Sequence, residues 1–288
     1  MSSLEIIDGK KEGVLKTYYT TGELMSEKTY KKGMIVGEER FYNKDGTFQQ
    51  VINYQNNKKN GVARIFYSHG KVKTEMNFVN DLLDGTVKYF YENGELKAEL
   101  SYKEGEKDGP AKAYYMSGQI KIDENNVEGK TEGTKTTFYK SGSVKGVWEY
   151  KMGVPHGESK FFYENGELLG LKSYNYGKEH GETKIFYPDG TVKEEIVYDN
   201  GTKIGTQVKY DRDGNVTREI KYSVFEDSGF QQNVLKVSDS KNETSTSKVN
   251  SPMVQNSPQK KISALSATLI LIIFALIIFI LYMFLIGF

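Results

Sequence analysis

The chain has 288 residues, with 39 lysines and arginines against 38 aspartates and glutamates, so its net charge is close to zero. This balance argues against a nucleic-acid-binding protein, which normally carries a basic excess. The sequence has no cysteine, which excludes disulfides and thiolate metal sites. Frequent glycine (29), tyrosine (21) and phenylalanine (15) favour many short strands joined by tight turns.

A repeat with a period of 24 residues begins after a lead-in of residues 1–12 and continues through nine units, from residue 13 to residue 228. The lead-in has no apolar stretch long enough for a secretory signal. Two glycines recur in every unit without an insertion or a deletion. The first series is Gly13, Gly37, Gly61, Gly85, Gly109, Gly133, Gly157, Gly181 and Gly205, and the second is Gly22, Gly46, Gly70, Gly94, Gly118, Gly142, Gly166, Gly190 and Gly214. Such a regular period is typical of a repeat protein.

Each unit has the sequence pattern of a β-hairpin. An aromatic residue stands four positions before the second glycine in all nine units. In the fourth unit, Glu92-Asn93-Gly94 predicts a three-residue loop with its glycine at positive φ, which places Phe90 opposite Leu96. Strict alternation from this pair predicts an apolar face with Phe90, Leu96, Leu100 and Tyr102, and a charged face with Tyr91, Glu95, Lys97 and Glu99.

A second corner is marked by residues that tolerate the left-handed conformation. At the 24-residue period, eight of the nine units place Gly, Asn or Asp there: Gly33, Asn57, Asp81, Gly105, Gly129, Gly153, Gly177 and Gly201. The last unit has Phe225 instead, as expected of a terminal repeat.

The phrases YFYENGEL (89–96), FFYENGEL (161–168) and IFYPDGTV (185–192) resemble the MORN repeat in its second, bacterial-type variant. Proteins built only of this variant are often labelled YwqK-type antitoxin proteins. The resemblance covers residues 13–228 and implies an all-β repeat fold. In that fold, nine stacked antiparallel β-hairpins form an elongated, twisted, single-layer sheet.

The remainder of the chain has a different composition. Residues 229–261 are rich in Ser, Asn, Thr and Gln and are predicted to be a disordered polar linker. Residues 262–288 contain 27 residues without a charge, which predicts one transmembrane helix. Lys260 and Lys261 precede it and no charge follows, so we expect a single-pass tail anchor with the repeats in the cytoplasm.

Catalytic and metal-binding residues are not expected. His156 and His180 share one position in adjacent units, about 9.6 Å apart, too far for both to bind one ion through bonds of about 2 Å. His69 is a corner residue. Charged residues recur as ladders, not as one convergent pocket. The acidic ladder is Glu27, Glu75, Glu99, Asp123, Glu195 and Glu219; the basic one is Lys16, Arg40, Arg64, Lys88, Lys112, Lys160 and Lys184. We therefore predict no enzyme, no cofactor, no metal and no small-molecule substrate.

A stripe of tyrosines beside the first corner is the candidate partner-binding site. Two interpretations remain open: a contact surface, since tyrosine is enriched at interfaces, or a brace in which each ring packs over its neighbour. The candidate residues are Tyr67, Tyr91, Tyr115, Tyr139, Tyr163 and Tyr187; Tyr19 shares their position, which Asn43 and Asp211 occupy in two other units. Trp148, the only tryptophan, stands at an inward strand position and is predicted to pack.

The functional prediction is a non-catalytic, membrane-tethered scaffold or protein-interaction module whose protein partner is unidentified. Two alternatives remain. The sheet itself binds a lipid surface, which the near-neutral charge disfavours, or the chain inhibits a cognate toxin, as the family label suggests.

Overall fold

The computed structural model describes residues 3–222 and 234–239, and every regular element in these residues is a β-strand. The strands are β1 (Glu5–Ile7), β2 (Lys10–Tyr18), β3 (Leu24–Lys31), β4 (Met34–Tyr42), β5 (Phe48–Gln55), β6 (Lys58–Phe66), β7 (Val72–Val79), β8 (Leu82–Leu83), β9 (Gly85–Phe90), β10 (Leu96–Lys103), β11 (Glu106–Tyr114), β12 (Ile120–Val127), β13 (Lys130–Thr131), β14 (Gly133–Phe138), β15 (Val144–Lys151), β16 (Val154–Phe162), β17 (Leu168–Asn175), β18 (Lys178–Glu179), β19 (Gly181–Phe186), β20 (Val192–Asp199), β21 (Thr202–Tyr210), β22 (Val216–Tyr222) and β23 (Val234–Asp239).

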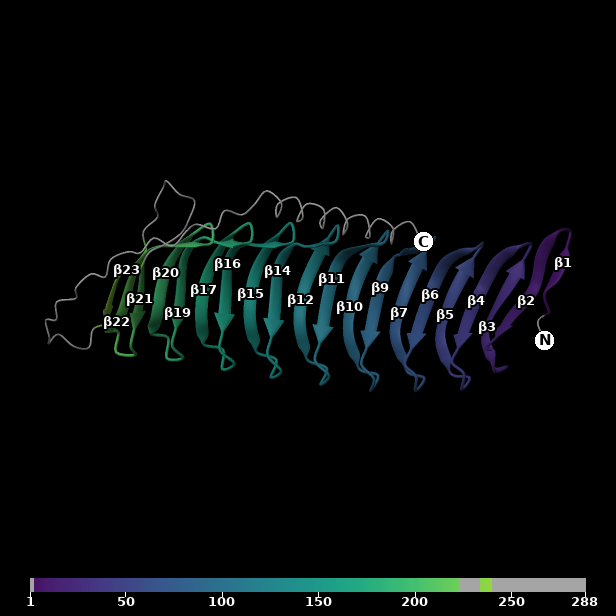
Figure 1. The fold of residues 1–288 in the computed structure, drawn as a ribbon. Helices are drawn as coiled ribbons and strands as arrows, with labels where there is room; N and C mark the ends of the chain where they lie inside the picture. Colours follow the sequence, from purple (N-terminus) through teal and green to yellow (C-terminus); the bar gives the residue numbers. More distant parts are fainter. Residues whose placement is uncertain (1–2, 223–233, 240–288) are drawn as a thin grey trace, which may run out of the picture. The chain divides into compact units, whose positions relative to one another are not determined.

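All of these strands belong to one antiparallel sheet, in which each strand pairs with the next along the chain (Figure 1). The two-residue strands β8, β13 and β18 are the first parts of strands that continue as β9, β14 and β19, which pair with the same neighbour. The prediction of an all-β fold with a single open antiparallel sheet is confirmed.

The first corner of each unit is the predicted three-residue loop. In the fourth unit Phe90 pairs with Leu96. The amide of Tyr91 donates to the carbonyl of Glu95 at 2.8 Å, and the amide of Gly94 donates to the carbonyl of Tyr91 at 2.9 Å. Gly94 has a φ of 95°, where a side chain is penalised, which explains why this position is glycine in all nine units.

A β-bulge beside this corner makes the predicted division into faces wrong. Phe90 pairs with Leu96, but Tyr89 pairs with Ala98, so Lys97 is an extra residue that shifts the alternation of β10 by one. Phe90 and Leu96 therefore share a face with Lys88 and Glu99, here called the ladder face. The opposite face, here called the packed face, carries Val87, Leu100 and Tyr102. Strict alternation could not predict this change, because a bulge leaves no period-2 signal.

The second corner is a two-residue turn that also joins neighbouring hairpins. Between Lys103 and Glu106, Glu104 has a φ of 50° and Gly105 a φ of 91°, as in a type I′ turn. The amide of Gly105 donates to the carbonyl of Leu83, at the start of the strand that pairs with β10, at 2.8 Å. The predicted left-handed residues from Gly33 to Gly201 all have positive φ, whereas Phe225 lies outside the described residues.

The core of the sheet is a row of side chains on the packed face. Each unit contributes the residue two positions after its first glycine and the residue that pairs with it on the next strand, such as Val87 and Leu100 in the fourth unit. The row contains apolar members such as Val87, 1% exposed, and polar ones such as Glu39, 5% exposed. The Glu39 carboxylate accepts a 2.9 Å hydrogen bond from Lys28 on the adjacent strand, which offsets the cost of its burial. Each unit thus buries its own contribution against its neighbours, as in other repeat proteins.

The far end of the sheet has a strand that the sequence did not predict. β23 pairs with β22 and lies inside the predicted linker, residues 229–261. Its addition satisfies backbone groups that β22 would otherwise expose as an edge strand. The rest of that linker and the predicted transmembrane helix, residues 262–288, lie outside the described residues. No helix long and apolar enough to cross a membrane is found among residues 3–222 and 234–239.

Candidate functional site

The tyrosine stripe forms hydrogen bonds between units. Each hydroxyl donates to a backbone carbonyl at the matching corner of the next unit, at 2.7 to 2.9 Å. The pairs are Tyr19 with Tyr42, Tyr67 with Phe90, Tyr91 with Tyr114, Tyr115 with Phe138, Tyr139 with Phe162, Tyr163 with Phe186, and Tyr187 with Tyr210. All six predicted site residues therefore have the same structural contact, and the structure places them in one row.

Most rings of the stripe also lie under a lysine. Lys97, the extra residue of the bulge, places its Nζ 5.7 Å from the centroid of the Tyr91 ring. The lysine at the same position does this in four more units: Lys73 over Tyr67, Lys121 over Tyr115, Lys145 over Tyr139 and Lys193 over Tyr187. The bulge thus directs a cation onto the ring that follows the strand. Each stripe tyrosine thus bonds to the next unit, as expected of a brace, and five of the six candidate rings also lie under a lysine; a partner-binding role stays a prediction.

The second unit, one of the two without a stripe tyrosine, has a different contact in its place. Asn43 donates to Thr47 at 3.0 Å within its own loop and does not reach the next unit. In that unit alone the strand after the loop begins with an aromatic residue, Phe48, where other units have Leu, Val or Ile. The Phe48 ring stacks on Tyr42 at 5.2 Å and approaches Phe66 of the next unit at 5.7 Å. Aromatic packing therefore replaces the missing hydrogen bond at this junction.

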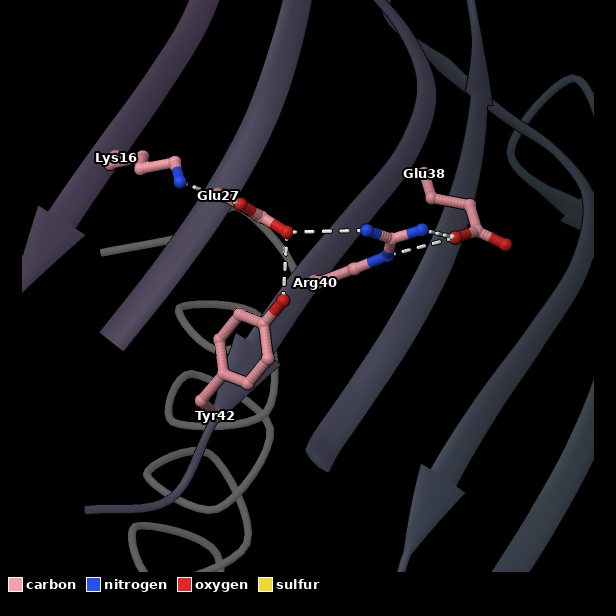
Figure 2. A network of polar contacts seen from close by, with 5 residues as sticks. All are labelled: Lys16, Glu27, Glu38, Arg40 and Tyr42. Carbon is pink, nitrogen blue, oxygen red and sulfur yellow. Dashed lines mark hydrogen bonds and ion pairs between the residues drawn. The ribbon is translucent and has the colours of Figure 1, made fainter. Parts of the chain in front are cut away.

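On the ladder face, charged residues pair between strands, as Figure 2 shows for the first two units. The Glu27 carboxylate lies 3.5 Å from Lys16 and 3.2 Å from Arg40, and it accepts a 2.7 Å hydrogen bond from the Tyr42 hydroxyl. The Tyr42 hydroxyl and then Arg40 hold the pKa of Glu27 below its usual value. Arg40 also pairs with Glu38 at 2.7 Å. Similar pairs occur further along, between Arg64 and Glu75, Lys112 and Asp123, and Lys184 and Glu195.

The choice between tyrosine and phenylalanine on this face follows the neighbouring unit. Tyr42, Tyr114 and Tyr210 donate to a carboxylate of the previous unit, respectively Glu27, Glu99 and Glu195, at 2.6 to 3.1 Å. Where the previous unit has an apolar residue at that position, namely Val51, Val147 or Leu171, the aromatic residue is Phe66, Phe162 or Phe186. The remaining two phenylalanines follow the carboxylates Glu75 and Asp123, which pair with Arg64 and Lys112. These three tyrosines therefore each have a carboxylate acceptor, as a half-buried phenol requires, but a carboxylate at that position does not by itself specify tyrosine.

The histidines have corner contacts. His156 Nδ1 accepts a 3.3 Å hydrogen bond from the amide of Tyr176 and its ring packs 4.6 Å from the Tyr176 ring. Glu132 accepts the corresponding amide bond one unit earlier. His180 Nδ1 lies 3.2 Å from Asp199. In the part of the chain that the structure describes, no group of three or more His, Asp or Glu side chains is placed to bind a metal ion.

Trp148 lies on the packed face, and its ring meets Phe161 edge-on at 5.3 Å. It borders a hollow of about 390 Å³ near Gly170 that the sequence analysis missed. The available signal was the pair Gly146 and Gly170, which are 24 residues apart and belong to neither glycine series.

The comparison with solved structures gives only matches of low sequence identity and low TM-score. One is a GtfA/B complex bound to UDP and GlcNAc (14% identity, 38% of this chain and 22% of that one, TM-score 0.19). Another is a TcdB2-TccC3-Cdc42 structure (11% identity, 77% and 15%, TM-score 0.20). A third is a porin-like protein from Bacteroides uniformis (10% identity, 76% and 91%, TM-score 0.18). The chain thus spans less than a quarter of the first two, and TM-scores this low support no inference.

No curated protein matches the chain. Comparison with family models gives a match to the MORN repeat variant at residues 11–32, 59–80, 83–104, 155–176 and 179–200. Each matched segment begins two residues before the first glycine of a unit and ends in its second corner, so it covers one hairpin. Five hairpins of this sheet therefore match the MORN repeat variant.

Proposed function

We propose that the chain is a non-catalytic scaffold of MORN-type repeats that is held at a membrane and binds another protein. The observation that carries this proposal is the even distribution of polar contacts. Tyrosine hydroxyls, carboxylates and lysines pair with the neighbouring strand or unit at the period of the repeat. Catalysis needs groups of different pKa that converge on one point, whereas an evenly braced sheet offers an ordered surface.

The membrane part of the proposal rests on the sequence. Residues 262–288 have no charge and exceed the length needed to cross a bilayer once. Lys260 and Lys261 on one side favour a cytoplasmic position for the repeats. The scaffold would then present its partner close to the membrane surface.

Binding of lipid by the sheet itself is the weaker alternative. On the ladder face, cations such as Arg40, Arg64 and Lys184 are paired with carboxylates. On that face, these pairs leave little positive charge for anionic headgroups, which attract clusters of unpaired lysine and arginine. Inhibition of a cognate toxin is a special case of protein binding, in which the bound partner is the toxin.

The test compares the full-length chain with a chain that ends at Asp239, in the cells from which the protein comes. We expect the full chain to be found with membranes, resistant to carbonate extraction, and the shorter chain to be soluble. Chemical cross-linking in intact cells should join lysines of the repeats to a protein, with the same partner recovered by the shorter chain in solution.

Three outcomes would contradict parts of the proposal. A soluble full-length chain would exclude the membrane anchor. Cleavage of the repeats by protease added outside intact cells would reverse their orientation. Binding of the shorter chain to vesicles of anionic lipid, with no protein cross-linked, would favour the lipid alternative.

A further inference from the structure

The hollow on the packed face lies beside a strand position that has no side chain. Gly170 on β17 pairs with Phe161 on β16 and with Ile185 on β19. The hollow of about 390 Å³ at this point is lined by these residues together with Trp148, Lys172 and Tyr174, among others. Its lining is thus mainly aromatic and aliphatic, and its volume lies within the range of about 300–1,000 Å³ that is usual for small ligand pockets.

The previous unit shows which group fits over a glycine at this position. Gly146 is the equivalent of Gly170, and a Cβ added there would lie 2.6 Å from Cη2 and 2.9 Å from Cζ3 of Trp148. The indole ring therefore occupies the space that the missing side chain leaves. The position of Trp148 corresponds to Lys172 in the next unit, and among the residues that the structure describes no ring lies within 4 Å of a Cβ added at Gly170.

Lys172 makes the hollow electrostatically suitable for a ring. Its ammonium pairs with Glu179, and its side chain is part of the lining of the hollow. Elsewhere on the packed face the chain places a lysine over an aromatic ring, as with Lys135 and Tyr150 at 5.6 Å or Lys203 and Tyr222 at 5.7 Å. An ammonium complements the negative face of an aromatic ring. At Gly170 the cation is present and the ring is absent.

We propose that the Gly170 hollow binds a single aromatic side chain that a protein partner presents. The ring lies beside Gly170, between Phe161 and Ile185, with the Trp148 indole on one side and Lys172 at the rim. Aromatic side chains in such pockets contribute strongly to protein interfaces. This inference rests on the proposed protein-binding function and names the contact that the partner makes.

Trp148 provides the measurement, because it is the only tryptophan in the chain and borders the hollow. The full-length protein in a mild detergent is titrated with a short uncharged peptide that has one central phenylalanine, and then with the same peptide carrying leucine. We expect a saturable change in Trp148 emission with the phenylalanine peptide. The leucine peptide should bind about tenfold more weakly, because it lacks the ring face that Lys172 complements.

Gly170→Leu fills the hollow, and we expect it to weaken binding of the phenylalanine peptide by at least about tenfold. The matched control is Ala98→Leu, which places the same side chain at the equivalent position three units earlier. A Cβ at Gly170 would lie 3.0 Å from the carbonyl of Lys184, so circular dichroism must show that Gly170→Leu folds. Lys172→Phe is the second variant, since its own ring should cover Gly170 as Trp148 covers Gly146; it should lose peptide binding and melt at a higher temperature.

Equal binding of the two peptides, or full binding by folded Gly170→Leu and by Lys172→Phe, would overturn the aromatic pocket. A free aromatic compound such as phenol that binds as tightly as the peptide would indicate a small-molecule site instead. Neither result affects the proposed function, which is tested by cross-linking of the repeats to a protein. Conversely, a pocket that binds the peptide in a chain without any protein partner would leave the pocket valid and the proposed function wrong.

Discussion

The hydroxyl of Tyr91 donates a 2.8 Å hydrogen bond to the carbonyl oxygen of Tyr114, 23 residues further along the chain. At the opposite corner of the sheet, the amide of Gly105 donates a 2.8 Å bond to the carbonyl of Leu83, at the start of the strand that pairs with β10. Both bonds recur along the sheet, so its strands are joined at both margins as well as by their ladder pairing. In such an array each unit is stabilised by its nearest neighbours.

Removing the stripe hydroxyls should lower stability without removing the rings. We expect Tyr91→Phe, Tyr115→Phe and Tyr139→Phe each to reduce the free energy of unfolding by roughly 0.5–1.5 kcal/mol, the usual net contribution of a hydrogen bond. Urea denaturation followed by circular dichroism measures the change. Tyr176→Phe is the control, because that side chain is 56% exposed. A triple variant as stable as the parent, but unable to capture the protein partner, would show that the stripe is a binding surface and not a brace.

At the junction between the second and third units, adding a stripe tyrosine should raise stability. Asn43→Tyr restores the side chain that bonds the next unit elsewhere, so we expect a gain of roughly 0.5–1.5 kcal/mol. Asn43→Phe adds the ring without the hydroxyl and should give a smaller gain. Phe48→Val, the residue of several other units, should cost about 0.5–1.5 kcal/mol through lost aromatic packing. Thermal melts of the parent, Asn43→Tyr, Phe48→Val and the double variant check this. If Asn43→Tyr does not restore the stability that Phe48→Val removes, the aromatic packing does not compensate for the missing hydrogen bond.

Alkaline pH should destabilise the sheet through its half-buried phenols. Burial, together with Glu39, Glu99 and Glu179 respectively, raises the pKa of Tyr54, Tyr114 and Tyr198 to about 12. A pKa raised in the folded state stabilises the fold fully below the unfolded value of 10 and loses that contribution as the pH rises through 12. We expect stability to be constant below a pH of about 10 and to fall between about 10 and 12.

Phenolate absorbance and circular dichroism, recorded together, follow this transition. Tyr114→Phe copies the residue of the preceding and following units, Phe90 and Phe138, and should make the loss less steep. If all the tyrosines instead titrate near their ordinary value while the strand signal is retained, the phenol–carboxylate contacts do not stabilise the fold.

Whole units should be removable. Deleting residues 109–132 joins Asp108 to Gly133, and Tyr91 then faces the carbonyl of Phe138 in place of Tyr114. We expect a folded protein that melts at a slightly lower temperature. Deleting residues 109–120 joins unlike strand positions and should unfold at least the junction. Circular dichroism and thermal melts of both chains give the comparison, and equal tolerance of the two deletions would mean that the repeat is not the structural unit.

The sequence predicts the hairpins because their corners depend on single residues. Gly94 and Gly105 occupy positive φ, where glycine is the least costly choice, so the corners leave a signal at a fixed period. The pairing of Phe90 with Leu96 follows from the loop length and is confirmed. The bulge at Lys97 leaves no such signal, since an extra residue in a strand accepts many side chains, and the predicted faces are wrong from that point onward.

The contacts of the stripe are a similar case. The sequence places Tyr91 and its equivalents in one row. The acceptor of the hydroxyl is a backbone carbonyl, however, and because every residue has one, the sequence does not reveal which carbonyl accepts the bond. The hollow at Gly170 depends on a missing side chain and on the ring of Trp148 one unit away, so only the three-dimensional packing shows it. Strand β23 is also beyond a periodic analysis, because its residues do not repeat the 24-residue pattern.

The bonds at the two margins also determine how the sheet would respond to force. When the chain is pulled from its ends, the terminal hairpin is peeled away first, and its ladder bonds break one after another. The stripe bond at one margin and the turn bond at the other would then break separately, because they lie near opposite ends of a strand. Release of a 24-residue unit lengthens the chain by about 80 Å, so a force–extension trace would be a series of evenly spaced steps. The junction at Asn43, which has aromatic packing in place of the stripe hydroxyl, would open at a force different from that of its neighbours.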